Sequence, residues 1–144
     1  MPKSSTTVES FVSPAEFREI IVAVDKYPEF LPEVKKVEVK ERNASSLVAK
    51  FFVEVKVAGS EVKTEYTVRY ELGEHEVRWA LLESPTLTKN DGRWKLEETA
   101  DGETKATYEN ELVTSLPIPE ELQKVFADQE LPRMMQRFRD RAEG

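Results

Sequence analysis

The side chains with which this sequence could do chemistry are mostly neutral. It holds one histidine and no cysteine, so a thiolate metal site and a cysteine nucleophile are excluded. His75 stands between Glu74 and Glu76 in a predicted hairpin turn, and a catalytic triad would have to act from that turn. Metal sites need several ligands on converging elements. The sequence therefore predicts no metal site and no cofactor.

General acid–base catalysis would need ionisable groups on the apolar side of the predicted strands. In residues 47–57 and 62–72 that side holds no carboxylate, lysine or histidine. Glu83 and Glu98 share the apolar register of later strands, but a hairpin would place them at opposite ends, too far apart for a catalytic pair. The remaining polar groups are those of Thr64, Tyr66, Tyr70, Tyr108 and Asn110. They can hydrogen-bond a carbonyl or hydroxyl but are poor bases at neutral pH, so we predict no catalytic residue.

Aromatic residues and methionines gather on the same apolar side. They could form an ordinary core, yet buried indole and phenol groups each need a polar partner, and methionine adapts to the shape of a ligand. The excess of such polar groups favours a cavity for a flat or long apolar molecule. Its predicted ligand-binding residues are Phe51, Tyr66, Tyr70, Trp79, Trp94, Tyr108, Asn110, Phe126 and Met135.

The elements that would position these residues begin with a strand over residues 6–12. Ser13 can cap a following helix, Pro14 suits its first position and Glu16 completes a capping box. The proline-rich stretch 25–32 ends that helix and leaves room for one short further turn. This stretch is either an apolar gate or a rigid corner whose rings pack on the core.

Apolar residues then recur at every second position, which predicts half-buried strands. The predicted strands are 34–42, 47–57, 62–72, 76–83, 92–99 and 104–115. The turns between them are too short for parallel crossovers, so the sheet is expected to be antiparallel. Asp101-Gly102 is typical of a type I′ hairpin turn, and residues 85–92 are expected to form a hinge loop.

A final helix is predicted from Pro117 to about residue 141, with a kink at Pro132. Arg133, Arg137 and Arg141 recur every four residues along it and form a basic stripe. The stripe either complements the negative end of the helix in solvent or meets an acidic or RNA partner.

The predicted fold class is α+β. A seven-stranded antiparallel curved sheet must bury one face, and the C-terminal helix is its only large apolar partner. We therefore expect the sheet to wrap around this long helix, with two short helices after the first strand. The chain of 144 residues has no linker or repeat, so residues 1–144 are expected to form a single domain.

Composition limits the environment and the partners of the protein. No stretch approaches the ~20 apolar residues needed to cross a bilayer, and the N-terminal residues lack the apolar core of a signal peptide. A cytoplasmic location is expected. The net charge of −7 argues against nucleic acid as the main ligand, because phosphate contacts need basic residues.

The segment Asp25-Lys26-Tyr27-Pro28-Glu29-Phe30-Leu31-Pro32 carries a family resemblance. It is similar to the Asp-x-Tyr-Pro-x-Phe-x-Pro motif of the polyketide cyclase and coenzyme Q-binding branch of the START-like (SRPBCC) superfamily. Gly92-x-Trp94-x-Leu96 and the amphipathic last helix extend the resemblance over nearly the whole chain. It implies a helix-grip fold. One departure is Ser84-Pro85-Thr86-Leu87, where close relatives of the quinone-binding and ribosome-associated branches tend to carry Gly-Pro-Phe.

Residues and resemblance together favour a protein that binds or carries an apolar small molecule, such as a quinone, a lipid or an aromatic polyketide, between the sheet and the C-terminal helix. Two alternatives stay open. One is a polyketide cyclase or dehydratase that steers a reactive chain with phenol groups. The other is a ribosome- or protein-associating module that uses the basic stripe. Contact with a membrane would be at most transient, and no obligate protein partner is expected.

Overall fold

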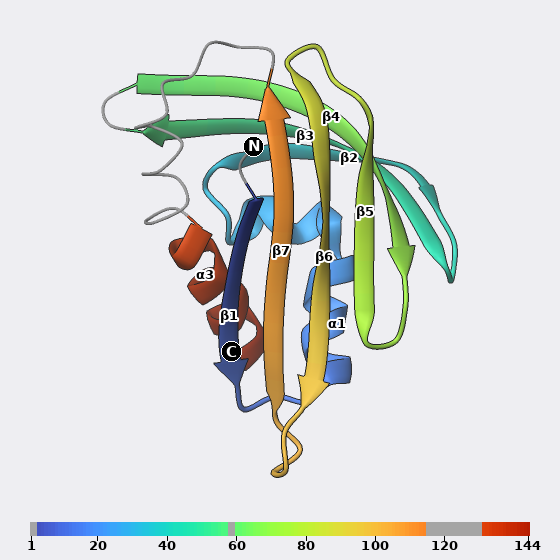
Figure 1. Ribbon diagram of the computed structural model, residues 1–144, viewed down its shortest axis with the longest axis vertical. Coiled ribbons are helices and arrows are strands. Elements are labelled where there is room, and N and C mark those ends of the chain that lie inside the picture. Colours follow the sequence, from blue (N-terminus) through green and yellow to red (C-terminus); the bar gives the residue numbers. More distant parts are fainter. Residues whose placement is uncertain (1–2, 58–59, 115–130) are drawn as a thin grey trace.

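The computed structural model describes residues 3–57, 60–114 and 131–144 (Figure 1). Its elements are β1 (Lys3–Ser10), α1 (Pro14–Val22), the 3₁₀ helix η1 (Val24–Glu29), β2 (Val34–Arg42), β3 (Ser46–Val57), β4 (Ser60–Leu72), β5 (Glu76–Glu83), β6 (Leu87–Glu98), β7 (Thr104–Thr114) and α3 (Leu131–Glu143). The predicted helix start at Pro117 and the reversal at Ala58-Gly59 lie outside the described residues.

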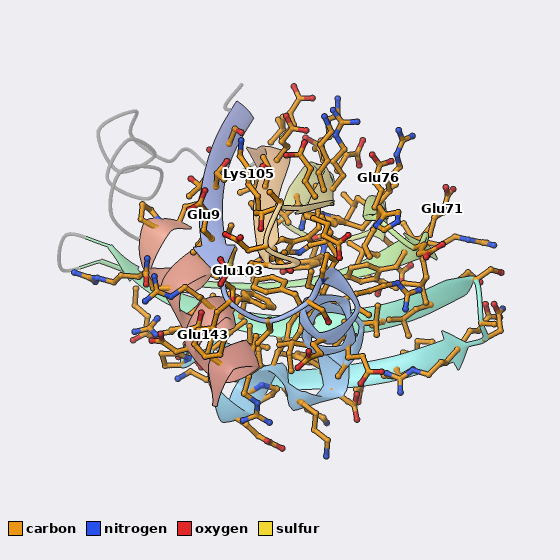
Figure 2. All side chains as sticks on the ribbon, turned by 90° about the horizontal axis from the view of Figure 1, so that it is seen from below. Glu9, Glu71, Glu76, Glu103, Lys105 and Glu143 are labelled. Carbon is orange, nitrogen blue, oxygen red and sulfur yellow. The ribbon has the colours of Figure 1, made fainter. Side chains whose placement is uncertain are left out.

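The seven strands form one sheet in the order β1-β7-β6-β5-β4-β3-β2, and every neighbouring pair is antiparallel. Figure 1 shows the sheet bending so that β2, β3 and β4 cross over the ends of the other strands, with α1 and α3 on the concave side. On the outer side the charged side chains of Glu71 and Glu76 project away from the helices (Figure 2). The α+β class, the antiparallel curved sheet and the helices inside it are confirmed.

Helix α1 begins as its sequence predicts. The hydroxyl of Ser13 accepts a hydrogen bond from the Glu16 backbone N–H at 3.3 Å, and the Glu16 carboxylate accepts one from the Ser13 N–H at 3.5 Å. This capping box orients the helix so that Phe17 and Ile21 are completely buried.

The core lies between the sheet and the two helices. Phe17 of α1, Trp94 of β6 and Phe138 of α3 meet at its centre, with ring centroids 5.8 Å apart for Phe17–Trp94 and 5.0 Å for Trp94–Phe138. The end of α3 is tied to β1, because the Ser10 hydroxyl donates to the Glu143 carboxylate at 2.8 Å. Both helices thus pack on the concave face, and the C-terminal end of α3 is also hydrogen-bonded to β1.

Two local predictions are wrong. The expected hinge loop over 85–92 is mostly strand, because β6 begins at Leu87 and residues 89–92 pair with β7. Long-range pairing here overrides the turn preference of Asn90, Asp91 and Gly92. The remaining short loop is held by the Ser84 hydroxyl, which accepts from the Leu87 N–H at 3.0 Å and donates to the Glu65 carbonyl at 2.7 Å.

The β6–β7 turn is also not the two-residue type I′ turn suggested by Asp101-Gly102. The Gly102 N–H donates to the Thr99 carbonyl at 3.0 Å, and the Thr99 N–H donates to the Glu103 carbonyl at 2.9 Å. Gly102 is the last residue of the turn over residues 99–102, and its φ of 78° is the left-handed conformation that glycine favours. This is the three-residue hairpin loop that ends in a glycine bulge.

Candidate functional site

The concave face collects the residues that the sequence singled out. Alternation along the strands turns Phe51, Tyr66, Tyr70, Trp79, Trp94, Tyr108 and Asn110 to this side, and Met135 of α3 packs on the same core. Ring contacts run from Phe51–Tyr66 at 5.4 Å to Tyr70–Trp79 at 5.9 Å and Trp79–Tyr108 at 5.3 Å. Phe126 lies outside the described residues. The structure brings the other eight together; that they bind a ligand stays a prediction.

One end of this face is an aromatic corner made of Tyr27, Phe30, Phe51, Tyr70 and Phe138. Tyr27 and Phe30 each meet Phe138 edge-on at 5.2 Å. The Tyr27 hydroxyl donates to the backbone carbonyl of Ile21, and the Tyr70 hydroxyl is hydrogen-bonded to that of Tyr27. Tyr27 and Phe30 of the stretch 25–32 therefore pack on the core, and the Tyr27 hydroxyl is engaged within the fold.

The other end is a polar cluster made of Tyr66, Trp79, Asn90, Tyr108 and Asn110. The Asn90 side-chain oxygen accepts from the Trp79 indole N–H at 3.2 Å and from the Asn110 amide at 3.4 Å. The same Asn110 amide donates to the Tyr108 hydroxyl oxygen at 3.1 Å. Asn90 is only 4% exposed. Three strands, β5, β6 and β7, thus converge on one buried amide.

The two phenols of the polar cluster are protonated at neutral pH. Burial raises the pKa of Tyr108 to about 12, and a hydrogen bond to Asn110 opposes that rise. Burial likewise raises the pKa of Tyr66, opposed by its hydrogen bond to Asn90. The Tyr108 oxygen already accepts a bond, while within the described chain no bond uses its proton. The cluster can therefore offer O–H groups to an oxygen acceptor on a ligand.

Asn90 is a further member of the site that the sequence does not indicate, because the turn-forming residues around it predict a loop. Asn90, Gly92, Trp94 and Leu96 all occupy even positions, and this alternation was the available signal that the strand begins earlier. Thr64 differs from the other predicted polar groups, since its hydroxyl is already hydrogen-bonded to that of Thr86.

Metal and acid–base chemistry find no support in the described part of the chain. No group of His, Cys, Asp and Glu side chains there could hold a metal ion. His75 is exposed, 3.9 Å from the Glu74 carboxylate, and Glu83 and Glu98 are exposed as expected. Apart from the tyrosines and Trp79, the buried polar side chains among the described residues are Ser10, Thr67, Asn90 and Thr104. None of them is ionisable at neutral pH.

The basic stripe on α3 has partners within the fold. Arg141 lies 2.6 Å from the Glu29 carboxylate and stacks over the Phe30 ring at 5.3 Å, and Arg137 lies 3.5 Å from the Glu33 carboxylate. These pairs fasten α3 to the aromatic corner. Two of the three arginines of the stripe are thus paired within the fold, and a ribosome- or protein-associating module stays an alternative prediction. In the part of the chain that is described, no helix is long and apolar enough to span a membrane.

Known proteins share both the sequence pattern and the fold. Residues 13–139 match the family described as "Polyketide cyclase / dehydrase and lipid transport". No curated protein matches the chain significantly. The match confirms the resemblance seen in the Asp25–Pro32 motif, and the family description covers two of the function classes left open by the sequence: apolar ligand binding and polyketide cyclisation or dehydration.

Several solved structures superpose on nearly the whole chain. The Zhui aromatase/cyclase from Streptomyces sp. R1128 has a TM-score of 0.81 at 20% identity, covering 99% of this chain and 93% of its own. A START superfamily protein from Mycobacterium smegmatis has a TM-score of 0.78 at 20% identity, covering 98% and 97%. A STAR-related lipid transfer protein from Xanthomonas axonopodis has a TM-score of 0.79 at 14% identity, covering 97% and 85%. At these identities the likeness shows the helix-grip fold.

Proposed function

Because the chain belongs to the polyketide cyclase/dehydrase and lipid transport family, we propose that it binds an apolar small molecule on the concave face of its sheet, between the sheet and the C-terminal helix. The polar cluster anchors the ligand and the surrounding rings enclose its apolar part. The residues assigned to the ligand are Phe51, Tyr66, Trp79, Trp94, Tyr108, Asn110, Phe126 and Met135, together with Asn90. Tyr70 lines the site with its ring only, since its hydroxyl is bound to Tyr27.

The observation that carries this proposal is the polar cluster itself. A core that served stability alone would fill these positions with aliphatic residues, because each buried polar group must find a partner. Here five side chains with polar groups meet inside an aromatic wall, and within the described chain no bond uses the Tyr108 proton. Such a site suits a ligand with one or two carbonyl or hydroxyl oxygens on an otherwise apolar body.

The ligand classes that meet this description are quinones, lipids and aromatic polyketides. Two similar structures point the same way, since one is described as an aromatase/cyclase and another as a lipid transfer protein. A quinone or polyketide presents its carbonyl oxygens at the edge of a flat ring system. That edge matches phenol and amide donors set among stacked and tilted rings.

The test is native mass spectrometry of the protein purified from its own host, followed by organic extraction of anything bound. A stoichiometric apolar passenger is the expected result and would identify the chemical class. An empty protein that also fails to bind a panel of quinones, fatty acids and aromatic polyketides would overturn the proposal.

A polyketide cyclase or dehydratase is the second candidate, favoured by the protonated phenols of the polar cluster. Tyr66 and Tyr108 could polarise a substrate carbonyl by donating hydrogen bonds, without any ionised base. Replacing either tyrosine by phenylalanine would then abolish turnover of a polyketide substrate while binding persists. A protein that binds the polyketide but never turns it over would instead support the carrier.

The cytoplasm is the proposed location, supported by the absence of cysteine and by the charge-rich composition. The proposed partner is the apolar ligand. The net charge of −7 argues against nucleic acid, and contact with a membrane would be limited to the transfer of a ligand.

A further inference from the structure

The sheet is incomplete between β5 and β6. Only Glu76–Trp79 of β5 pairs with Gly92–Lys95 of β6, although β5 continues to Glu83 and β6 begins at Leu87. The pairings of β5 with β4 and of β6 with β7 are not interrupted in this way. β4 stays paired with β5 up to Glu83, and β7 stays paired with β6 up to Leu87. Beyond Trp79, β5 and β6 thus diverge while each remains anchored on its other side.

Two β-bulges flank the divergence. On β5, Thr67 and Val68 of β4 pair with Glu83 and Leu81, so Leu82 is an extra residue. On β6, Val113 and Thr114 of β7 pair with Lys89 and Leu87, which leaves Thr88 as an extra residue. Bulges bend a strand and increase its twist, and they occur often beside functional sites. Each of the two strands therefore contains a bulge that bends it where β5 and β6 separate.

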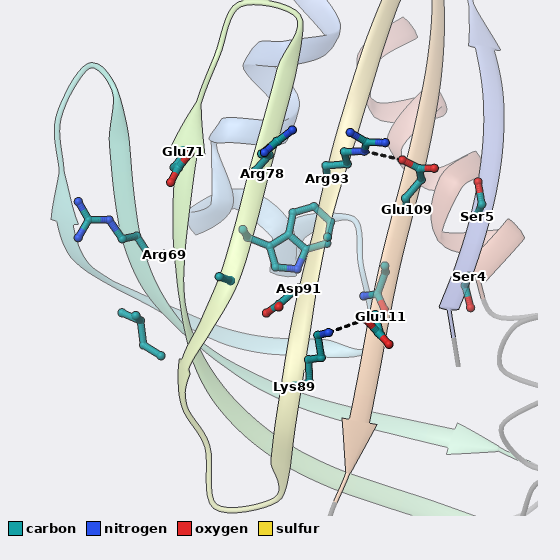
Figure 3. A pocket seen from close by; sticks show the side chains of 15 residues that line it. Ser4, Ser5, Arg69, Glu71, Arg78, Lys89, Asp91, Arg93, Glu109 and Glu111 are labelled. Atoms are coloured by element: carbon teal, nitrogen blue, oxygen red, sulfur yellow. Dashed lines mark hydrogen bonds and ion pairs between the residues drawn. The ribbon is translucent and has the colours of Figure 1, made fainter. Parts of the chain in front are cut away.

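A carboxylate takes the place of the missing ladder. The Asp91 side chain accepts a hydrogen bond from the Leu81 backbone N–H at 3.2 Å. Figure 3 shows Asp91 between the diverging β5 and β6 strands. No backbone hydrogen bond joins β5 to β6 beyond the Trp79–Gly92 pair. The outer layer of this gap is closed by one side-chain contact, which we name the Asp91 latch.

The inner layer of the gap is the Trp79 indole. A Cβ atom on residue 92 would stand 2.5 Å from the Trp79 ring and 2.4 Å from the Glu109 carbonyl oxygen, so only glycine lets the indole lie against the strand. On its inner side the indole N–H donates to Asn90. Trp79 is 8% exposed, lines the outer face of the sheet and contacts Asn90 of the polar cluster.

An open groove of about 680 Å³ leads to this indole on the outer face of the sheet (Figure 3). Its wall includes Trp79, Gly92 and Asn110, which also belong to the concave side. Arg93 is ion-paired with Glu109 at 2.5 Å on its rim. Beside these charges Leu82 is 55% exposed, which gives an apolar molecule a surface to contact before it reaches the gap.

We propose that the gap between β5 and β6 is a side entrance to the ligand site, opened when the Asp91 latch breaks and the Trp79 indole turns away. This inference rests on the proposed ligand-binding function. Opening disrupts one hydrogen bond at the latch and one at the indole, and leaves every backbone ladder intact. Asn90 keeps the Asn110 amide as a donor while the indole is displaced.

The experiment measures the rates at which N-phenyl-1-naphthylamine, a flat fluorescent apolar probe, enters and leaves the protein. Asp91→Ala removes the latch and is expected to raise the association and dissociation rates together by about fivefold, the factor that one net hydrogen bond gives. The Kd stays unchanged because Asp91 lies outside the site. The matched control Asp91→Asn keeps an oxygen acceptor for Leu81, so its rates stay within about twofold of the parent protein.

A reversible disulfide across the gap is expected to slow the exchange of the probe. Residues 80 and 91 stand across the gap in the register set by Trp79 and Gly92, and the chain has no other cysteine, so Ala80→Cys with Asp91→Cys can form a single disulfide. The oxidised protein is expected to exchange the probe at least about tenfold more slowly than the same protein reduced, at equal Kd.

Unchanged exchange rates in Asp91→Ala, or in the oxidised double-cysteine protein where that disulfide forms, would overturn the side entrance while leaving the binding function intact. A parent protein that binds neither this probe nor any member of the panel of quinones, fatty acids and aromatic polyketides would overturn the proposed function itself. The two failures are therefore distinguishable.

Discussion

The aromatic corner and the polar cluster lie on the same face of the same sheet, and each contains two tyrosines. In the corner, the hydroxyls of Tyr27 and Tyr70 bond to each other and to the Ile21 carbonyl, so they end within the fold. In the cluster, Tyr66 and Tyr108 contact the side-chain amides of Asn90 and Asn110. One pair of phenols completes a corner, whereas the other keeps protons available to a ligand.

This difference teaches that residue type alone does not identify a ligand contact. All four tyrosines have a raised pKa and burial as its main cause. What distinguishes the two corner tyrosines from the two cluster tyrosines is the set of groups to which their hydroxyls are hydrogen-bonded. Stability should therefore depend on the corner and ligand affinity on the cluster, and the following predictions divide the two.

The largest expected effect is the loss of stability when the corner loses its central ring. Phe138 is buried and contacts Tyr27, Phe30 and Trp94 edge-on. Phe138→Ala should lower the free energy of unfolding by about 3–5 kcal/mol, as measured by urea denaturation. Phe11→Ala is the matched control because Phe11 is 63% exposed, and it should change stability by less than about 0.5 kcal/mol. Equal effects of the two changes would contradict the packing described for α3.

Alkaline pH should destabilise the protein through the corner tyrosines. Burial raises the pKa of Tyr27 and Tyr70 well above the value of about 10 that they have in the unfolded chain. Above about pH 10 the unfolded chain releases these two protons, whereas the folded chain keeps them. The contribution of the two tyrosines to the free energy of unfolding is therefore fully present below about pH 10 and decreases as the pH rises. Each of the two contributes about 1.4 kcal/mol of loss by pH 11.

Urea denaturation at about pH 8 and pH 11, with tyrosinate absorbance recorded in parallel, tests this loss. Tyrosinate should appear together with unfolding. In the folded protein, Tyr108 of the cluster should ionise before the corner tyrosines, since its pKa rises only to about 12. A folded protein with all four tyrosines ionised at about pH 11 would contradict the burial of the corner.

Tyr27→Phe should separate stability from binding. The change leaves the Ile21 carbonyl and the Tyr70 hydroxyl without a partner, which lowers the free energy of unfolding by about 1–3 kcal/mol. The affinity of the folded protein for 1,4-naphthoquinone, measured by quenching of tryptophan fluorescence, should stay within about twofold because the Tyr27 hydroxyl is not among the groups assigned to the ligand.

Tyr108→Phe should give the converse result. Losing its O–H group should weaken 1,4-naphthoquinone binding about fivefold to tenfold. Its stability loss should be about 1 kcal/mol or less, since the Asn110 amide keeps its bond to Asn90. If Tyr27→Phe weakened binding more than Tyr108→Phe, the assignment of the two regions would be reversed.

Most of the fold could be predicted because its signals are local. The capping box at Ser13 fixes α1, and alternation through β3 and β4 shows which residues face the helices. The aromatic part of the site follows from the same alternation. For Asn90 the same alternation competes with the turn preference of Asn90, Asp91 and Gly92, which only the pairing with Leu112 of β7 overrides.

The gap between β5 and β6 could not be predicted from the local sequence. Its two bulges, at Leu82 and Thr88, depend on the register of β5 against β4 and of β6 against β7. Registers between strands are set by the whole sheet, and no pattern within either strand shows that one residue is extra. The latch from Asp91 to Leu81 exists only because these registers diverge.

The most direct test of the central claim follows the side-chain amide NMR signals of Asn90 and Asn110 while 1,4-naphthoquinone is added. If the polar cluster anchors an apolar ligand, both signals shift in a saturable manner with one ligand per protein, and Tyr108→Phe weakens that saturation. If both signals stay unmoved while the quinone still binds, the ligand lies elsewhere and the cluster is only part of the core.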